Sequence, residues 1–427
     1  FGTVATIFQK AANPGFKGHY SCVRYYETDD QGVPFEFPVR NERLARASAA
    51  DFKKIPGAPI AYWVSERVRE IFFKAQTTIG HITISDGQTK TGDNDRYLRQ
   101  IWEVEQRKIG GSQKWWLHPK GGSFRRWYGN VDWIINWSSE ARKHYRADRV
   151  ARILPDYLWG RRGVSWTLIT SSEISFRILE ENQIFNLAAP SLFFKDDRDI
   201  PVSLGFLNTK FVSQILKVIN PTLNMNVGEV QMLPLLDIVQ FHRVEVTRLV
   251  QSLLRLSKDD WDAYETSWDF TTLPLLRPEH RQATLAATYA HLRRHWQAMT
   301  DEMQRLEEEN NRIFIAAYGL QDELTPDVPR HEITLTCNPH YRYSGQLAVD
   351  SGQLEQRLLA DTMRELISYA VGCMFGRYSL DKPGLILANA GETVEDYARK
   401  VGEWRVESGD SAIGGLSDFA TGEDGAA

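Results

Sequence analysis

The sequence is poor in cysteine, and this absence narrows the classes of protein that it can encode. Only Cys22, Cys337 and Cys373 occur among 427 residues, and no two of them form a Cys-x-x-Cys pair. An odd number of widely separated cysteines argues against a disulfide framework and against a cysteine-rich zinc site. Three reduced thiols are typical of a cytoplasmic protein.

Common catalytic signatures are missing as well. The sequence has no GxxxxGK[ST], GxGxxG, HExxH or GxSxG pattern, which removes support for nucleotide hydrolysis, dinucleotide binding and the usual metal-dependent or serine hydrolases. His291 and His295 are four residues apart on an expected helix. The sequence shows no third ligand near them, so no metal site is predicted.

Long apolar runs and a strong net charge are also absent. No run approaches the roughly 18 residues that span a bilayer, and stretches such as Ile313–Tyr318 are expected in a core. The formal net charge is only −4. The chain begins at Phe1 in a strand-like run without the pattern of a signal peptide. We therefore expect a piece of a longer protein.

The order of patterns predicts an α+β fold in four segments. Strand-like runs (Val4–Gln9 and His19–Tyr26) and a helix (Ser65–Lys74) fill residues 1–75. Short strands and one apolar helix over Leu204–Ile219 fill a module at 76–235. Two long helices form a hairpin spacer at 236–320, where the run Glu307-Glu308-Glu309 is expected on a solvated face. A mainly helical part with an acidic tail occupies 321–427.

One window departs from the overall charge balance. Between Lys108 and Ser165 there are twelve Lys and Arg residues against four Asp and Glu, an excess of eight positive charges. Six tryptophans are interleaved with them, at positions 115, 116, 127, 133, 137 and 159. Cations replace counterions at phosphates and flat side chains stack on bases, so this window favours a polyanion. A solvated basic helix at 140–152 beside a tryptophan-rich core is the structural alternative, and composition does not separate the two.

Several blocks, in order, carry a resemblance to a known family. They are 51–63 (DFKKIPGAPIAYW), 87–99 (GQTKTGDNDRYLR), Lys120-Gly121-Gly122 with 125–130 (RRWYGN), 134–137 (IINW), 163–166 (GVSW), 175–177 (SFR), 204–210 (LGFLNTK) and 220–224 (NPTLN). Together they resemble the part of adenine-specific DNA methyltransferases that follows the catalytic domain. The nearest likeness is to the PglX family of BREX phage-defence systems and to fused restriction–modification enzymes, over about residues 1–400.

The resemblance implies a post-catalytic fragment that contains the target-recognition region. The parent would use S-adenosylmethionine to methylate the amino group of adenine. The cofactor loop and the Asn-Pro-Pro-Tyr/Phe loop of that family are absent here. We therefore expect the fragment to bind double-stranded DNA, to need no cofactor of its own and to be inactive alone, with other phage-defence subunits as further partners.

A set of polar residues is predicted to contact DNA. Arg125 and Arg126 follow a Gly-Gly turn and are candidates for a guanine edge or a phosphate, although internal pairing with Asp132 or Glu140 is the alternative. The full predicted set is Thr91, Asp93, Asn94, Arg96, Lys120, Arg125, Arg126, Asn130, Arg161, Arg162, Asn208 and Asn224. For the asparagines, roles in turns and caps remain open.

Two other functions are compatible with the sequence. The helical hairpin and the acidic tail fit a protein-interaction module that docks partner subunits of a defence complex. A tryptophan-rich glycan binder is a third reading, which the positive window disfavours. A DNA binder would lose affinity steeply with salt, whereas a tryptophan platform for glycans would not.

Overall fold

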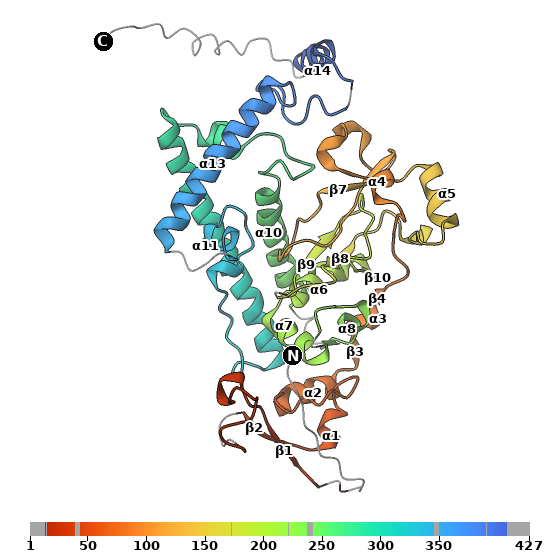
Figure 1. Cartoon of the computed structure of the whole chain (residues 1–427), viewed down its shortest axis with the longest axis vertical. Coiled ribbons are helices and arrows are strands. Elements are labelled where there is room, and N and C mark those ends of the chain that lie inside the picture. Colours follow the sequence, from red (N-terminus) through yellow and green to blue (C-terminus); the bar gives the residue numbers. More distant parts are fainter. Residues whose placement is uncertain are drawn as a thin grey trace.

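The computed structural model (Figure 1) describes residues 13, 15–38, 43–171, 173–220, 222–236, 242–345, 350–389 and 391–407. The strand expected at Val4–Gln9 lies outside these residues. Helices and short strands mix along the chain, so the α+β class is confirmed. No helix in the described part is long and apolar enough to cross a membrane.

The first segment is a two-stranded sheet followed by short helices. Strand β1 (Gly18–Ser21) pairs antiparallel with β2 (Leu44–Ala47). The expected helix after Ser65 is present as α2 (Glu66–Lys74), and the Ser65 hydroxyl accepts a bond from the amide of Val68. The remaining elements of this segment are η1 (Tyr25–Glu27) and α1 (Ala49–Phe52).

Two antiparallel sheets form the centre of the module that follows. The larger sheet has the order β4 (Thr83–Ile84), β10 (Ser191–Phe194), β8 (Gly163–Trp166) and β9 (Phe176–Leu179). The smaller sheet has the order β5 (Leu98–Gln100), β7 (Trp133–Asn136) and β6 (Trp115–Leu117). Strand β3 (Thr77–Thr78) pairs with β11 (Pro234–Leu235). Every residue of β8, β9 and β10 is buried, so the larger sheet lies inside the protein.

Short helical turns connect these elements. The α-helical ones are α3 (Ile79–Ile82), α4 (Asn94–Tyr97), α5 (Ser139–Ala147), α8 (Val227–Gln231) and α12 (Pro339–Arg342). The 3-10 turns are η2 (Ile101–Glu103), η3 (Gln106–Lys108), η4 (Asp156–Leu158), η5 (Asp197–Asp199), η6 (Pro274–Leu276), η7 (Pro278–His280) and η8 (Arg330–Glu332). The basic helix considered for 140–152 ends at Ala147, where Asp148 is the C-cap.

The apolar helix expected over Leu204–Ile219 is in fact two helices. Helix α6 (Ile200–Leu207) ends at Asn208, and α7 (Lys210–Ile219) begins after Thr209, whose hydroxyl accepts from the amide of Val212. The Asn208 side chain bonds both the amide and the carbonyl of Phe176. These bonds hold the junction against β9 and explain why the helix is interrupted.

Long helices make up the rest of the chain: α10 (Arg243–Trp261), α11 (Leu285–Tyr318), α13 (Ser351–Met374) and α14 (Val394–Glu407). The two helices expected in the 236–320 segment are therefore present as α10 and α11. Both helices pack on α6 within the largest hydrophobic core, which also includes side chains of β8 and β9.

Candidate nucleic-acid interface

Arg125 lies in the protein interior, bonded to an aspartate from α10. Its Nη2 is 2.6 Å from an Oδ atom of Asp260, and both side chains are almost completely buried. Asp260 also accepts bonds from the amides of Thr336 and Cys337, at 2.7 and 2.9 Å. The pair thus joins the module to α10 and to the segment before α12.

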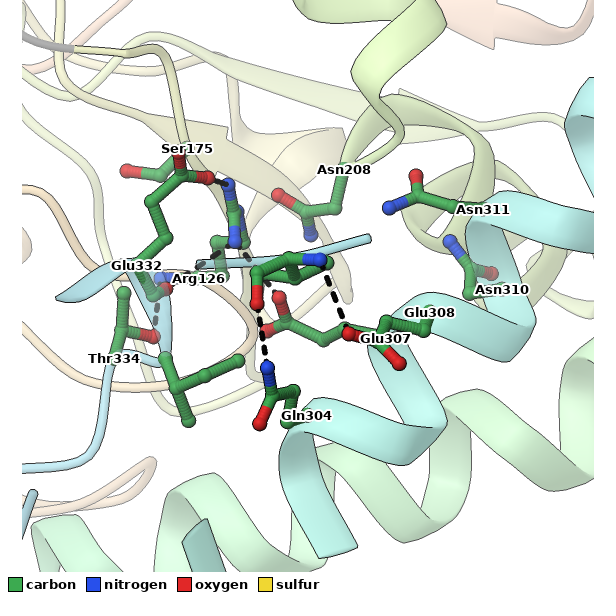
Figure 2. A network of polar contacts seen from close by, with 12 residues as sticks. Arg126, Ser175, Asn208, Gln304, Glu307, Glu308, Asn310, Asn311, Glu332 and Thr334 are labelled. Carbon is green, nitrogen blue, oxygen red and sulfur yellow. Dashed lines mark hydrogen bonds and ion pairs between the residues drawn. The ribbon is translucent and has the colours of Figure 1, made fainter. Parts of the chain in front are cut away.

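Arg126 is buried between two glutamates (Figure 2). Its guanidinium is 2.7 Å from Glu307 of α11 and 2.7 Å from Glu332 of η8, while its amide bonds the hydroxyl of Thr334 at 3.1 Å. Glu307 also accepts from the indole of Trp127. Burial alone would lower the pKa of Arg126, but the two carboxylates hold it above its usual value. Arg126 is therefore a charged structural centre.

These contacts correct three sequence-based expectations. Arg125 and Arg126 do not lie on an exposed face, because their charges are already neutralised by buried carboxylates that are distant in sequence. Their partners are also not Asp132 or Glu140. The run of glutamates at 307–309 is not wholly solvated either, since Glu307 is buried to meet Arg126. Buried cations require such partners, because desolvation of an unpaired charge is costly.

Other predicted residues have structural contacts that explain their presence. Thr91 is buried and bonds Asn94 at 2.7 Å, and Asp93 caps α4 through the amide of Arg96. Asn130 has a positive φ of 58° and bonds the carbonyl of Ser123. Asn208 holds the helix junction described above. The cap and turn roles left open for the asparagines thus account for Asn130 and Asn208.

Arg161 and Arg162 are half-buried and engaged. Arg161 donates to the carbonyl of Phe194 at 2.6 Å and lies 3.7 Å from Asp197. Arg162 pairs with Glu180 at 3.0 Å. The predicted residues therefore do not converge on one point. Some lie in the interior, some lie in two surface groups described next, and Arg161 and Arg162 lie outside both of those groups.

The first surface group is a set of loops at one end of the larger sheet. Because β8 is antiparallel to both β9 and β10, the end of β8 meets the starts of β9 and β10. We call residues 120–123, 167–171, 186–188 and 222–226 the loop platform. The loops are joined by bonds from Thr167 Oγ1 to the carbonyl of Gly122, from the amide of Leu168 to Ala188, and from the amide of Met225 to Leu168.

The Gly-Gly turn of the platform depends on glycine at both positions. Gly121 and Gly122 have φ values of +84° and +117°. A Cβ on Gly121 would lie 2.8 Å from the carbonyl oxygen of Ala188, and one on Gly122 would lie 2.7 Å from the Asn130 side chain. The turn leaves Gly122 and Ser123 exposed, while the Lys120 ammonium lies 4.5 Å from the centre of the Trp133 ring. Of the predicted residues, Lys120 and Asn224 belong to this platform.

The second surface group is a basic flank formed by Lys90, Arg96, Lys143, Arg149 and Arg152. Tyr97 at the end of α4 stacks on His144 of α5 with ring centres 4.7 Å apart, and Figure 1 shows both helices on the same side of the molecule. Lys90 and Arg152 are linked by two backbone hydrogen bonds of 2.9 and 2.8 Å. All five side chains are exposed, and none forms an ion pair with any residue that the structure describes.

The two surface groups adjoin each other. Thr89 bridges Asn186 of the loop platform, and the next residue, Lys90, bridges Arg152 of the basic flank. Four of the five flank residues were not in the predicted set, although Lys143, Arg149 and Arg152 lie in the positive window. The signal that could have identified them is their place on and around the capped helix α5 within or beside the positive window.

The tryptophans of the positive window do not form a stacking platform. Trp115, Trp116, Trp127 and Trp137 are buried in hydrophobic clusters, and Trp133 and Trp159 are half-buried against them. They therefore supply packing rather than an exposed surface for bases or glycans. This arrangement favours the tryptophan-rich core that composition had left open.

The histidine pair of α11 gains a neighbour in the structure. His280 of η7 lies with its ring centre 5.8 Å from that of His291 and 5.0 Å from that of His295. Burial lowers the pKa of His280, and the two neighbouring imidazoles lower it further. No group of three or more His, Cys, Asp or Glu residues in the described ranges is arranged to hold a metal ion.

Comparison with known proteins identifies two relatives. Over 417 residues the chain is 31% identical to an adenine-specific methyltransferase PglX of Lacticaseibacillus casei (strain Zhang), which covers 92% of this chain and 33% of that protein. Over 350 residues it is 32% identical to an adenine-specific methyltransferase BrxX of Escherichia coli O9:H4 (strain HS), covering 80% of this chain and 28% of that protein. The chain thus spans about one third of the length of these relatives. No protein-family model matches it.

One solved structure shows a weaker similarity. It is the type IIL restriction–modification enzyme MmeI in complex with DNA, with a TM-score of 0.38 and 11% identity, covering 64% of this chain and 37% of that one. A similarity of that size supports no argument about this chain. The two sequence relatives belong to the family that the ordered blocks predicted. The chain is related to the adenine-specific methyltransferases PglX and BrxX over about one third of their length.

Proposed function

We propose that this chain is the DNA target-recognition and helical part of an adenine-specific DNA methyltransferase of phage defence or restriction–modification, acting in the cytoplasm. The remaining two thirds of the protein would bind S-adenosylmethionine and transfer its methyl group to the adenine amino group. This chain would bind double-stranded DNA and position it for the reaction. It would need no cofactor and would not methylate DNA alone.

The basic flank is the observation that carries the proposal. Internal carboxylates neutralise Arg125 and Arg126, so those side chains are not offered to DNA. The exposed cations at positions 90, 96, 143, 149 and 152 remain without ion-pair partners in the described structure. Exposed cations without ion-pair partners beside a loop platform suit a polyphosphate backbone, because phosphate contacts position a protein while loops can reach base edges.

Salt-dependent DNA binding tests the proposal. We expect the full chain to bind a 30-base-pair duplex with an affinity that falls steeply between low and moderate salt. The triple variant K143A/R149A/R152A should weaken binding to all sequences alike and lower the salt slope by about 3, because each lost phosphate contact lowers it by about 1. Fluorescence anisotropy at four salt concentrations measures both quantities.

A control variant tests whether the effect depends on where the positive charges are removed. Arg248 and Arg255 are exposed arginines on α10 and lie outside the basic flank, so R248A/R255A should leave the slope nearly unchanged. Equal effects of the two variants, or an affinity that does not respond to salt, would contradict the proposed role of the flank. Incubation with labelled S-adenosylmethionine and duplex DNA should give no label transfer.

The alternative of a protein-interaction module has one specific observation in its favour. The second half of α13 exposes Ile367, Val371, Met374 and the adjoining Phe375 at helical spacing. An exposed apolar stripe of this kind is typical of helix docking surfaces. Both functions can coexist, since the stripe and the basic flank are on different elements.

A further inference from the structure

One of the four asparagines predicted to contact DNA keeps an unbonded side-chain amide in the described part of the chain. The side chains of Asn94, Asn130 and Asn208 are all bonded within the protein. Asn224 is exposed, and only its main chain takes part in the hydrogen bonds that join it to other described residues. A side-chain amide offers both donors and an acceptor. Because Asn224 uses none of them in a cap or a turn, they are available to a ligand.

Asn224 is paired with Ile169 of the neighbouring loop. The two residues form an antiparallel bridge, and a backbone hydrogen bond between the loops lies on each side of it, at 3.1 and 2.8 Å. In such a pair the two side chains point to the same face and lie close together. Leu223 and Met225 alternate with Asn224 and point to the other face, where Met225 is buried. Ile169 is 62% exposed, so an aliphatic and an amide side chain stand side by side at the surface.

The backbone that carries this pair is firmly held. The indole of the buried Trp166 donates to the carbonyl of Met225 at 2.8 Å. The Asn220 side chain donates to the carbonyl of Asn224 at 2.7 Å and accepts from the hydroxyl of Thr222 at 2.7 Å. Contacts that distinguish one base from another need side chains on a fixed support. The paired loops provide such a support for both side chains.

The charge around the pair does not oppose DNA. The loop platform contains no Asp or Glu, and Lys120 is its only cation. The carboxylates nearest to the paired loops in sequence are already engaged, since Glu173 pairs with Lys217 and Glu229 accepts from the side chain of Asn220. Phosphate groups can therefore approach the pair without repulsion from the platform itself.

We propose that Asn224 and Ile169 form a reading pair that recognises two adjacent A·T base pairs in the major groove of bound DNA. This inference rests on the proposed DNA-binding function and assigns a sequence-reading role to the platform. The Asn224 amide can donate to N7 of an adenine and accept from its amino group, and Ile169 can pack on the methyl group of a thymine. Cross-strand side chains stand about 4.5–5.5 Å apart at Cβ, and bases follow each other about every 3.4 Å along a strand. The two side chains therefore reach neighbouring base pairs.

Selection from 30-base-pair duplexes with a randomised centre tests the reading pair. We expect the full chain to enrich a motif that has an adenine at one position and a thymine in the adjoining base pair. The variant N224A should lose the preference for adenine, by about fivefold or more. The variant I169A should lose the preference for thymine, by about fourfold, because one buried methyl group is removed from the contact. Both variants should keep the salt slope of the unaltered chain.

Base analogues test the same two contacts from the side of the DNA. In the selected duplex, 7-deazaadenine lacks the N7 acceptor and deoxyuridine lacks the thymine methyl group. We expect 7-deazaadenine to weaken binding of the unaltered chain about fivefold and to leave N224A unaffected. Deoxyuridine should weaken the unaltered chain about fourfold and leave I169A unaffected. A loss that disappears when its partner is already removed indicates direct contact.

The control variant is L223A, which shortens an aliphatic side chain of similar exposure on the opposite face of the same paired loops. It should keep both base preferences. Full preferences in either N224A or I169A, or equal losses in L223A and I169A, would overturn the reading pair while leaving salt-dependent binding intact. The absence of any enriched motif for the unaltered chain would overturn it as well. Loss of salt-dependent binding to every duplex would instead overturn the proposed function itself.

Discussion

Three arginines of the module, Arg125, Arg126 and Arg177, are more important to its interior than to its surface. Arg177 is buried, and it donates to the carbonyl of Arg125 and to the hydroxyl of Thr167. Burial lowers the pKa of Arg177 to about 10. Together these side chains connect the larger sheet with α10, α11 and η8. The cost of burying them is offset by several charge-assisted hydrogen bonds.

Replacing Arg126 by methionine should strongly destabilise the protein. The substitution keeps much of the side-chain volume but leaves Glu307 buried without its cation. We expect a loss of about 3–5 kcal/mol in the free energy of unfolding, measured by urea denaturation. The half-exposed pair Arg162–Glu180 is the control, and R162A should cost about 1 kcal/mol or less. Similar losses in the two variants would contradict the structural role of Arg126.

His118 should make the protein sensitive to mild acid. Its ring is fully buried between the carbonyl of Ile184 and the amide of Asn186, and burial lowers its pKa to about 3. The unfolded chain takes up this proton near pH 6.5, so the stabilisation is complete above pH 6.5 and is lost as pH falls toward 3. The slope from this group is about 1.4 kcal/mol per pH unit in that range.

The variant H118N isolates this effect. Asparagine can still donate to the carbonyl of Ile184 but does not titrate. We expect H118N to be less stable than the unaltered chain at pH 7.5 and to lose less stability between pH 6.5 and 5. Parallel pH profiles of urea-induced unfolding would show that His118 is not the group responsible.

At the scale of elements, α6 packs between the larger sheet and the long helices α10 and α11. Gly205 sits where α6 meets α10 and α11, and its carbonyl accepts from the Asn310 amide at 2.9 Å. A Cβ at this position would lie 2.9 Å from Val246 and 3.0 Å from both Asn310 and Val250. Figure 2 shows Asn310 and Asn311 of α11 beside Asn208, and Asn311 accepts from the amide of Lys210 at the start of α7.

Gly205→Val should therefore separate helices that now touch. We expect a loss of roughly 1–3 kcal/mol, or more, because extra methyl groups in a packed interior force neighbours apart. Gly205→Ala should cost less, and Gly228→Val should be nearly neutral in packing because a Cβ at Gly228 meets nothing within 4 Å. Thermal and urea denaturation rank the three variants. An order in which Gly228→Val is the most harmful would contradict the proposed packing role of Gly205.

At the scale of the whole molecule, the C-terminal helix α14 returns to the module at 76–235. Lys400 of α14 is buried and lies 2.6 Å from Glu392 and 3.4 Å from Glu105, which separates η2 from η3. Its ammonium also donates to the carbonyl of Ile386 at 2.9 Å. One lysine thus joins segments that are almost 300 residues apart in sequence.

Lys400→Met should loosen this attachment without unfolding the core. Glu392 would then lose its cation, whereas Glu105 would keep Arg107 at 3.0 Å, so the ionic link between them would be broken and α14 would separate from the module more often. Hydrogen exchange followed by mass spectrometry should show faster exchange over 394–403 and unchanged exchange in α10. The exposed Lys74 of α2, which pairs with Glu70, gives a control substitution with no expected effect on α14. Unchanged exchange at 394–403 would show that apolar contacts alone hold the helix.

The sequence by itself determined the local elements and the family. Apolar residues at helical spacing predicted a helix at 65–74 and two long helices within 236–320, which are present as α2, α10 and α11. Such signals lie within a few residues of one another. The ordered blocks gave the methyltransferase relationship for the same reason, since they are read along the chain.

Only the tertiary structure decided which charged side chains are exposed without an ion-pair partner. Arg125 and Arg126 follow a flexible turn and look exposed in sequence, but their carboxylate partners are 135, 181 and 206 residues away. No local pattern predicts a contact over such a separation. The same holds for the loop platform, which the antiparallel order of β10, β8 and β9 assembles from four distant segments. Because burial and pairing depend on the packed chain, the exposed cations and the pairing of Ile169 with Asn224 emerge only in three dimensions.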